Sequence, residues 1–153
     1  MTDWISTQRL QAKVTFAEGY SIEGDLHLQP GTALHQGVET PLEMLNRPED
    51  FFAMTLPSGG VTLVAKAQTA LVACPLVILD QDPERLAAAK SVFLEVQLAG
   101  GYEVRGSAHL ELPQSRTRAL DFLNASKGFF ALSDGETTWY VNRGLIRQVL
   151  PGD

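Results

Sequence analysis

The sequence predicts a mainly β protein built from two tandem small five-stranded barrels, residues 1–80 and 81–153. Three observations support this prediction: the chain repeats itself, short segments alternate between apolar and polar residues, and glycine-containing turns separate these segments. With 153 residues, a mass of 16.7 kDa and 44% hydrophobic residues, the chain has enough apolar material for one ordinary domain or two very small ones.

The repeat consists of two blocks that occur twice in the same order. Residues 13–28 (KVTFAEGYSIEGDLHL) and 95–110 (EVQLAGGYEVRGSAHL) share seven of sixteen residues at an offset of 82. Residues 42–54 and 120–132 share six of thirteen at an offset of 78. Unrelated segments would share about one residue in sixteen, so the sequence indicates a tandem duplication. Two copies are too few for a solenoid, and we interpret them as two similar small domains.

Each copy contains a predicted hairpin whose strands alternate between apolar and polar residues with a period of two, as half-buried strands do. Glycines between the strands suit a tight turn, because glycine tolerates positive φ. Gly24 and Gly106 fall on the inner face, which predicts a bend where a small barrel curls. The four predicted strands are residues 10–16, 20–28, 92–98 and 102–110.

A helical turn is predicted between the second and third strands of each copy. Thr40 and Glu43 have the spacing of a capping box, and Pro41 suits the first helical position. Asn46 and Asn124 suit a left-handed C-terminal cap. The predicted turns are residues 40–46 and 117–124, and the remaining predicted strands begin near Phe51, Val61, Thr69, Phe129, Thr138 and Leu145.

A short helix is also expected at the start of each copy. Before the second copy, Asp82 suits the N-cap, Pro83 suits the first helical position, and the alanines that follow favour a helix as far as Lys90. The first copy has a weaker counterpart at residues 2–8. The predicted order in each copy is therefore a helix, a hairpin, a helical turn and three strands.

This order resembles the Sm-like fold, a strongly bent five-stranded barrel of the SH3/Sm-like type with an N-terminal helix. The segment 96–101 is similar to the start of the first Sm signature, and Val141-Asn142-Arg143-Gly144-Leu145-Ile146 is similar to the Arg-Gly segment of the second. The resemblance implies an RNA-binding module that acts through the second copy. It would use Asn124, Arg143 and Arg147.

The second copy also resembles a group of small uncharacterised bacterial proteins. These proteins carry an Arg-x-x-Asp-hydrophobic-Leu-Asn segment, then an aromatic strand, then a strand of the form Tyr/Phe-Val-Asn-x-x-x-Ile. The corresponding segments here are residues 118–124, Phe129-Phe130 and residues 140–146. This resemblance implies a fold and brings no known activity.

Composition narrows the range of functions. The net charge of −6 does not favour general nucleic-acid binding, which requires a basic surface. The one cysteine, Cys74, excludes an intramolecular disulfide and an all-thiolate zinc site, and we expect it to be a buried structural thiol.

The N-terminus lacks the features of a signal peptide, and the longest apolar run, residues 70–79, is too short to span a membrane. We therefore expect a cytoplasmic protein.

We predict no catalytic, cofactor-binding or metal-binding residues. His27 and His109 match across the copies and are expected on a solvated strand face, where Asp25 beside His27 makes too few ligands for a metal. Ser107 and His109 would need a distant acid to form a catalytic triad, and no strained nucleophile elbow accompanies them. His35 lies in a predicted loop and is uninformative.

The leading hypothesis is a non-enzymatic protein that binds another protein or itself, including as a homo-oligomer. Adjacent residues on a strand point to opposite faces, so Phe51-Phe52 and Phe129-Phe130 each place one ring inside a barrel and one outside. If Met54 and Leu132 point inward, the outer rings are Phe51 and Phe129. We predict that these two rings lie at an interface between copies or subunits.

Overall fold

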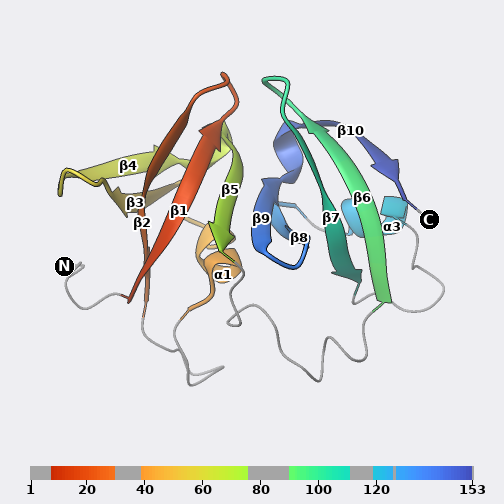
Figure 1. Cartoon of the computed structure of the whole chain (residues 1–153), viewed down its shortest axis with the longest axis horizontal. Helices are drawn as coiled ribbons and strands as arrows, with labels where there is room; N and C mark the ends of the chain where they lie inside the picture. The colour runs from red at the N-terminus through yellow and green to blue at the C-terminus, as the bar shows by residue number, and fades with distance from the viewer. Residues whose placement is uncertain (1–7, 30–38, 76–89, 111–118, 126, 153) are drawn as a thin grey trace.

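The computed structural model describes residues 8–29, 39–75, 90–110, 119–125 and 127–152, and it shows a mainly β protein (Figure 1). The strands form a single ten-stranded antiparallel sheet in the order β10-β6-β7-β8-β9-β5-β1-β2-β3-β4. The expected pair of separate five-stranded barrels is therefore not what the structure shows. The reason is that β5 of the first half pairs with β9 of the second, which satisfies backbone groups that two separate units would leave at their edges.

The elements follow the predicted order closely. The first half contains β1 (Gln8–Phe16), β2 (Ser21–Leu28), α1 (Pro41–Leu45), β3 (Phe51–Thr55), β4 (Val61–Ala65), the 3₁₀ turn η2 (Lys66–Gln68) and β5 (Thr69–Pro75). The second half contains β6 (Lys90–Leu98), β7 (Glu103–Leu110), α3 (Ala119–Asn124), β8 (Phe129–Ser133), β9 (Thr137–Asn142), η5 (Arg143–Leu145) and β10 (Ile146–Pro151).

Some predictions fall outside the described residues. They are the helices at residues 2–8 and 82–90, apart from their last residues, Gln8 and Lys90, which begin β1 and β6. The loop that contains His35 also lies outside the described residues. None of the described helices is long and apolar enough to cross a lipid bilayer.

The two halves pair their strands in the same register. The β1–β2 pairing places Gln8 opposite Leu28, and the β6–β7 pairing places Lys90 opposite Leu110, which is the same register at an offset of 82. The irregularity in the β1–β5 pairing also recurs between β6 and β10. We call residues at matching places counterparts. Their offset is 82 in the hairpins, 78 in the α1–β3 and α3–β8 segments, and 77 from β4 and β9 onward.

Two glycines allow the second and third strands of each half to approach closely. A Cβ atom at Gly24 would collide with the carbonyl oxygen of Thr55. A Cβ atom at Gly106 would lie 3.0 Å from the carbonyl oxygen of Ser133. A side chain at Gly24 would therefore require the neighbouring backbone to move, and one at Gly106 would make an unusually tight contact with it.

The helix α1 begins as predicted, with a capping box. The Glu43 backbone N–H donates to Thr40 Oγ1 at 3.1 Å, the Thr40 N–H donates to Glu43 Oε1 at 2.9 Å, and Pro41 takes the first helical position. The left-handed cap predicted at Asn46 is wrong, because its φ is −96°. The same prediction at Asn124 is also wrong, since no described residue other than glycine has a positive φ.

The core consists of two clusters, one in each half of the sheet. The first includes Val14, Leu26, Met54 and Val72, and the second includes Leu94, Val96, Leu132 and Val141. Cys74 is buried in the first cluster, as predicted.

The prediction that His27 points to solvent is wrong. Its side chain is buried, and Nε2 lies 2.6 Å from the hydroxyl oxygen of Thr55. This hydrogen bond offsets the free-energy cost of burying the polar imidazole. Burial lowers the pKa of His27 below its ordinary value of 6.5, the positive charge of Arg9 lowers it further, and Asp25 opposes the shift. The counterpart His109 is exposed, as predicted.

Candidate functional site

The two halves meet along the β5–β9 pairing, which we call the seam. It pairs five residues of each strand, from Leu71 opposite Val141 to Pro75 opposite Thr137. Figure 1 shows these two strands side by side in the middle of the molecule, with β4 and β10 at opposite ends. The seam is therefore a strand-to-strand contact between the edge of one half and the edge of the other.

Two aromatic side chains of the second half are buried at the seam. Phe129 on β8 is 4% exposed and Tyr140 on β9 is 0% exposed. Both belong to the core cluster whose other buried members all come from the first half, including Met44 and Leu45 on α1. The first half therefore supplies the apolar surroundings for these two rings.

Side-chain amides also link the halves. The amide of Asn46 bonds to the backbone of Phe129 in both directions, since Nδ2 donates to the Phe129 carbonyl at 3.0 Å and the Phe129 N–H donates to Oδ1 at 2.8 Å. The Asn142 Nδ2 donates to the carbonyl oxygens of Lys66 and Thr69, at 3.1 and 2.9 Å. Asn46 thus bonds to the backbone of Phe129, the first residue of β8, and Asn142 holds η2 against β9.

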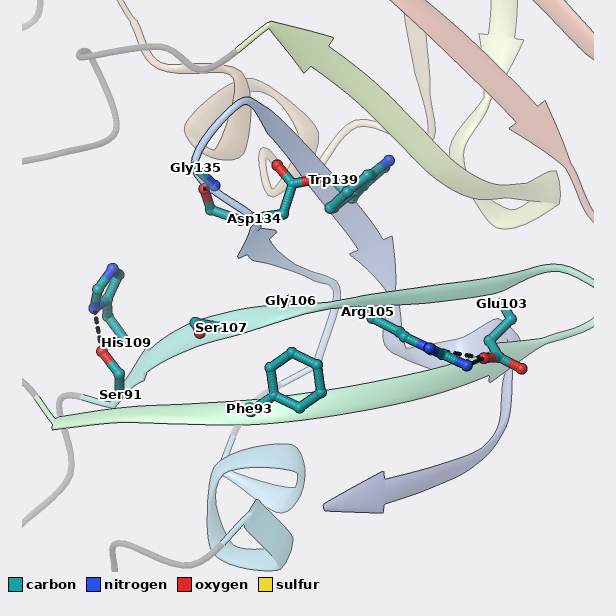
Figure 2. A pocket seen from close by; sticks show the side chains of 11 residues that line it. Ser91, Phe93, Glu103, Arg105, Gly106, Ser107, His109, Asp134, Gly135 and Trp139 are labelled. Atoms are coloured by element: carbon teal, nitrogen blue, oxygen red, sulfur yellow. Dashed lines mark hydrogen bonds and ion pairs between the residues drawn. The ribbon is translucent and has the colours of Figure 1, made fainter. Parts of the chain in front are cut away.

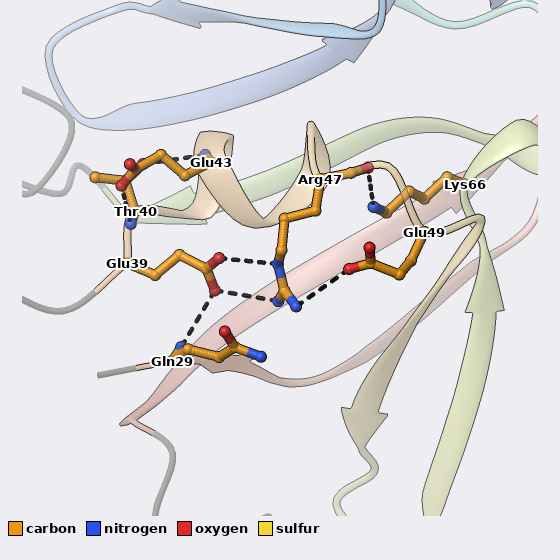
Figure 3. Close-up of polar contacts among 7 residues, drawn as sticks. All are labelled: Gln29, Glu39, Thr40, Glu43, Arg47, Glu49 and Lys66. Carbon is orange, nitrogen blue, oxygen red and sulfur yellow. Dashed lines mark hydrogen bonds and ion pairs between the residues drawn. The ribbon is translucent and has the colours of Figure 1, made fainter. Parts of the chain in front are cut away.

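A polar network holds the segment that follows α1 (Figure 3). Arg47 pairs with the buried carboxylate of Glu39 at 2.8 Å, and Lys66 Nζ donates to the Arg47 carbonyl at 2.9 Å. Burial lowers the pKa of Lys66, and the nearby charge of Arg47 lowers it further, while Glu49 and other acids oppose the shift. Arg47 and Lys66 are thus both bonded to groups within the first half.

The residues of the RNA-binding alternative are not equally accessible. Asn124 and Arg147 are exposed. Arg143 is only half-buried, and its guanidinium carbon lies 5.3 Å from the ring centre of Phe122 and 4.9 Å from that of Phe130. In this cation–π geometry the guanidinium packs against two rings of the second half.

A shallow groove of about 810 Å³ lies on the outer face of β6 and β7 (Figure 2). It contains Ser107 and His109, but the His109 Nδ1 lies 3.2 Å from the hydroxyl of Ser91, and Figure 2 marks no contact between His109 and Ser107. The Asp134 carboxylate accepts the backbone N–H groups of Thr137 and Glu136, both at 2.9 Å, and these bonds lower its pKa. Asp134 thus stabilises the turn between β8 and β9, and His109 faces Ser91 across the β6–β7 pairing.

Metal ligands are likewise not grouped in the described part of the chain, where no three His, Cys, Asp or Glu side chains lie close enough to hold an ion. The Asp25–His27 pair considered in the sequence has His27 turned to Thr55.

Large apolar side chains are exposed mainly at the two ends of the sheet. At the end formed by β3 and β4, which we call the β4 end, Phe51 is 59% and Leu63 is 68% exposed, and Val61 lies beside them. At the opposite end, which we call the β10 end, Leu120 on α3 is 60% and Leu150 on β10 is 47% exposed. Of the seven large hydrophobic residues exposed in the described parts of the chain, these ends hold five.

The counterparts of the β4-end residues are buried at the seam. Phe51 is the counterpart of Phe129, and Leu63 is the counterpart of Tyr140. A sixth exposed residue, Tyr20, has a similar relation, because the hydroxyl of its counterpart Tyr102 donates to the carbonyl of Gly19 in the other half. The same surface is thus covered in the second half and uncovered in the first.

The sequence led to Phe51 and Phe129 but missed the rest of this surface. The amide of Asn46 was assigned to a helix cap, and Leu63 was counted only as part of a strand. When the copies are aligned, Leu63 and Tyr140 are counterparts and form a second outward apolar pair beside Phe51 and Phe129. That signal would have identified the surface at the β4 end.

Comparison of the chain with protein-family models, curated proteins and solved structures found no match.

Proposed function

We propose that this protein is a non-enzymatic interaction and assembly module that binds a protein partner through the open ends of its sheet. The observation that carries the proposal is the contrast between counterparts. Phe129 and Tyr140 are buried at the seam, whereas Phe51 and Leu63 at the β4 end are exposed to solvent.

The β4 end has the properties of a binding edge. An edge strand presents unpaired N–H and C=O groups, and natural proteins usually protect such edges with charged residues or proline. The sequence of β4, VTLVA, contains neither. A partner that adds a strand there would gain backbone hydrogen bonds. Full burial of a side chain such as Phe51 or Leu63 is worth about 1.5–3 kcal/mol.

The non-enzymatic part of the proposal is supported by how the polar groups are used. In the groove of Figure 2, Asp134 accepts two backbone N–H groups and His109 faces Ser91. At the seam, Arg47 and Lys66 bond to groups of the fold itself. These engagements leave the polar clusters of the described chain in structural roles.

We also infer that the two halves arose by duplication of one five-stranded unit. The shared register of the hairpins, the shared β3–β4 and β8–β9 pairing and the shared irregularity before β5 and β10 support this inference. A duplicated unit explains why a surface that is used once inside the chain is present a second time at its end.

The experiment that tests the proposed function is site-specific photo-cross-linking in cells that produce the full chain. A photoreactive residue replaces Leu63 at the β4 end or, as a matched control, the exposed Gln11 on the outer face of β1. We expect discrete cross-linked products from position 63 and none from position 11. If position 63 gives no more product than position 11, the β4 end is not a binding site and the proposal is wrong.

A further inference from the structure

We propose that the partner of the β4 end is the β10 end of a second copy of this chain, so that chains assemble head to tail. This inference rests on the proposed function and names its partner. The seam joins β5, the fifth strand of the first half, to β9, the fourth strand of the second half. The two strands left at the ends of the sheet are β4, the fourth strand of the first half, and β10, the fifth strand of the second half. An interface between chains would therefore repeat the one inside the chain.

The seam predicts the register of this pairing. Val72 lies opposite Tyr140 at the seam, and the counterparts of these residues are Val149 and Leu63. Leu63 of one chain is therefore expected opposite Val149 of the next, in an antiparallel ladder. Pro151 has no N–H group, so the ladder is expected to end there.

The side chains at the two ends also match the seam. Phe129 packs at α1 in the first half, and the counterpart of α1 is α3. On that side Leu120 is exposed, and Leu123 and Val149 are half-buried. The ring of Phe51 from a second chain would cover these residues as Phe129 covers their counterparts.

A polar contact of the seam can be repeated as well. Asn124 is the counterpart of Asn46 and is exposed at the β10 end. In the assembly its amide would bond to the backbone of Phe51 of the next chain, as the Asn46 amide bonds to Phe129. The second amide contact cannot recur, because Ala65 is the counterpart of Asn142. The contact between chains is therefore expected to be weaker than the seam and reversible.

Charge favours this contact. The residues before β8, Lys127 and Gly128, lie beside Lys66 at the seam. Their counterparts before β3 are the acids Glu49 and Asp50, and the counterpart of Lys66 is Arg143. The contact between chains would thus add two acids beside Arg143, whereas the seam adds Lys127 beside Lys66, which also has Glu49 and Asp50 nearby. A head-to-tail contact of this kind closes into a ring or extends as a filament.

The first test is multi-angle light scattering of the full chain over a range of concentrations. We expect a mass that rises above the 16.7 kDa of one chain. Leu63→Glu should return the mass to one chain without unfolding, because this side chain is 68% exposed. Gln11→Glu is the control, since Gln11 is exposed on β1, which lies within the sheet between β5 and β2, and its variant should assemble as the wild type does.

The second test fixes the register with cysteines. A chain that carries Leu63→Cys and Val149→Cys should form disulfide-linked multimers under mild oxidation, because directly opposite residues lie within disulfide range. A chain that carries Thr62→Cys and Val149→Cys should not, because Thr62 points to the other face.

A mass of one chain at every concentration, with no multimers from the 63/149 pair, would overturn self-assembly. The proposed function itself is decided by the cross-linking experiment at position 63. If position 63 still cross-links to a different protein in cells, the β4 end remains an interaction site with another partner. If it cross-links to nothing, both proposals are wrong.

Discussion

Asn46 and its counterpart Asn124 occupy the same place in the two halves but have different surroundings. Both asparagines are exposed, but Asn46 makes two hydrogen bonds to the backbone of Phe129, whereas Asn124 lies at the open β10 end. The two asparagines therefore allow the same residue type to be compared at a position that contacts the other half and at one that does not.

Asn46→Ala should lower the free energy of unfolding by about 1–3 kcal/mol, because the N–H of Phe129 loses its partner and its carbonyl keeps only the longer bond from Arg143 Nη1, at 3.4 Å. Asn124→Ala should change it by less than about 0.5 kcal/mol in dilute protein, as substitutions at exposed positions usually do. Denaturant titration of both variants measures the difference. Equal losses would show that the Asn46 amide does not hold the seam.

His27 should make stability depend on pH. Its pKa is lowered in the folded protein, so below 6.5 the unfolded chain binds a proton that the folded chain does not. The contribution of His27 is therefore complete above pH 6.5 and decreases as the pH falls through the interval between 6.5 and the lowered pKa.

Thermal unfolding at a series of pH values between neutral and mildly acidic checks this prediction. His27→Gln should flatten the dependence just below pH 6.5. An unchanged slope in His27→Gln would assign the dependence to other groups.

At the scale of the elements, β3 and β8 have the same length and register but different environments. Phe129→Ala should lower the free energy of unfolding by about 3–5 kcal/mol, the usual cost of removing a buried phenylalanine ring. Phe51→Ala should have little effect on a single chain, because its ring is 59% exposed. Denaturant unfolding of dilute protein compares them. Similar losses for both variants would mean that Phe51 is also covered within one chain.

The elements themselves could be predicted because their signals are local. The capping box of Thr40 and Glu43 and the period-two alternation of the hairpins specify α1, β1 and β2 without reference to distant residues. The prediction failed for His27 and for the caps at Asn46 and Asn124. His27 is covered near Thr55 of another strand, and Asn46 bonds a residue 83 positions away, so neither contact leaves a local pattern.

At the scale of the whole molecule, the sequence predicted two related halves but not how they join. The pairing of β5 with β9 depends on which sheet edges meet in space. The alternation of apolar and polar residues within a strand predicts its buried face, but not the strand that it pairs with. The candidate site could be predicted in part. Phe51 and Phe129 follow from alternation, while the exposed Leu63 becomes informative only when its buried counterpart Tyr140 is known.

The RNA-binding alternative makes a separate prediction. The wild-type protein should not be retained on generic RNA at low salt, because its net charge is −6 and the Arg143 guanidinium lies over Phe122 and Phe130. Retention that falls steeply with salt, and that is lost when Arg143 and Arg147 are both replaced by Glu, would favour the alternative.

The claim that the sheet ends are open counterparts of the seam can be tested by hydrogen exchange at different protein concentrations. Amides of β9 should be protected at every concentration, because they lie within the sheet between β8 and β5. Outward amides of β4 should exchange quickly in dilute protein and become protected when the protein is concentrated, and Leu63→Glu should abolish that change. Protection of β4 equal to that of β9 in dilute protein, or exchange from β4 that does not depend on concentration, would contradict the account.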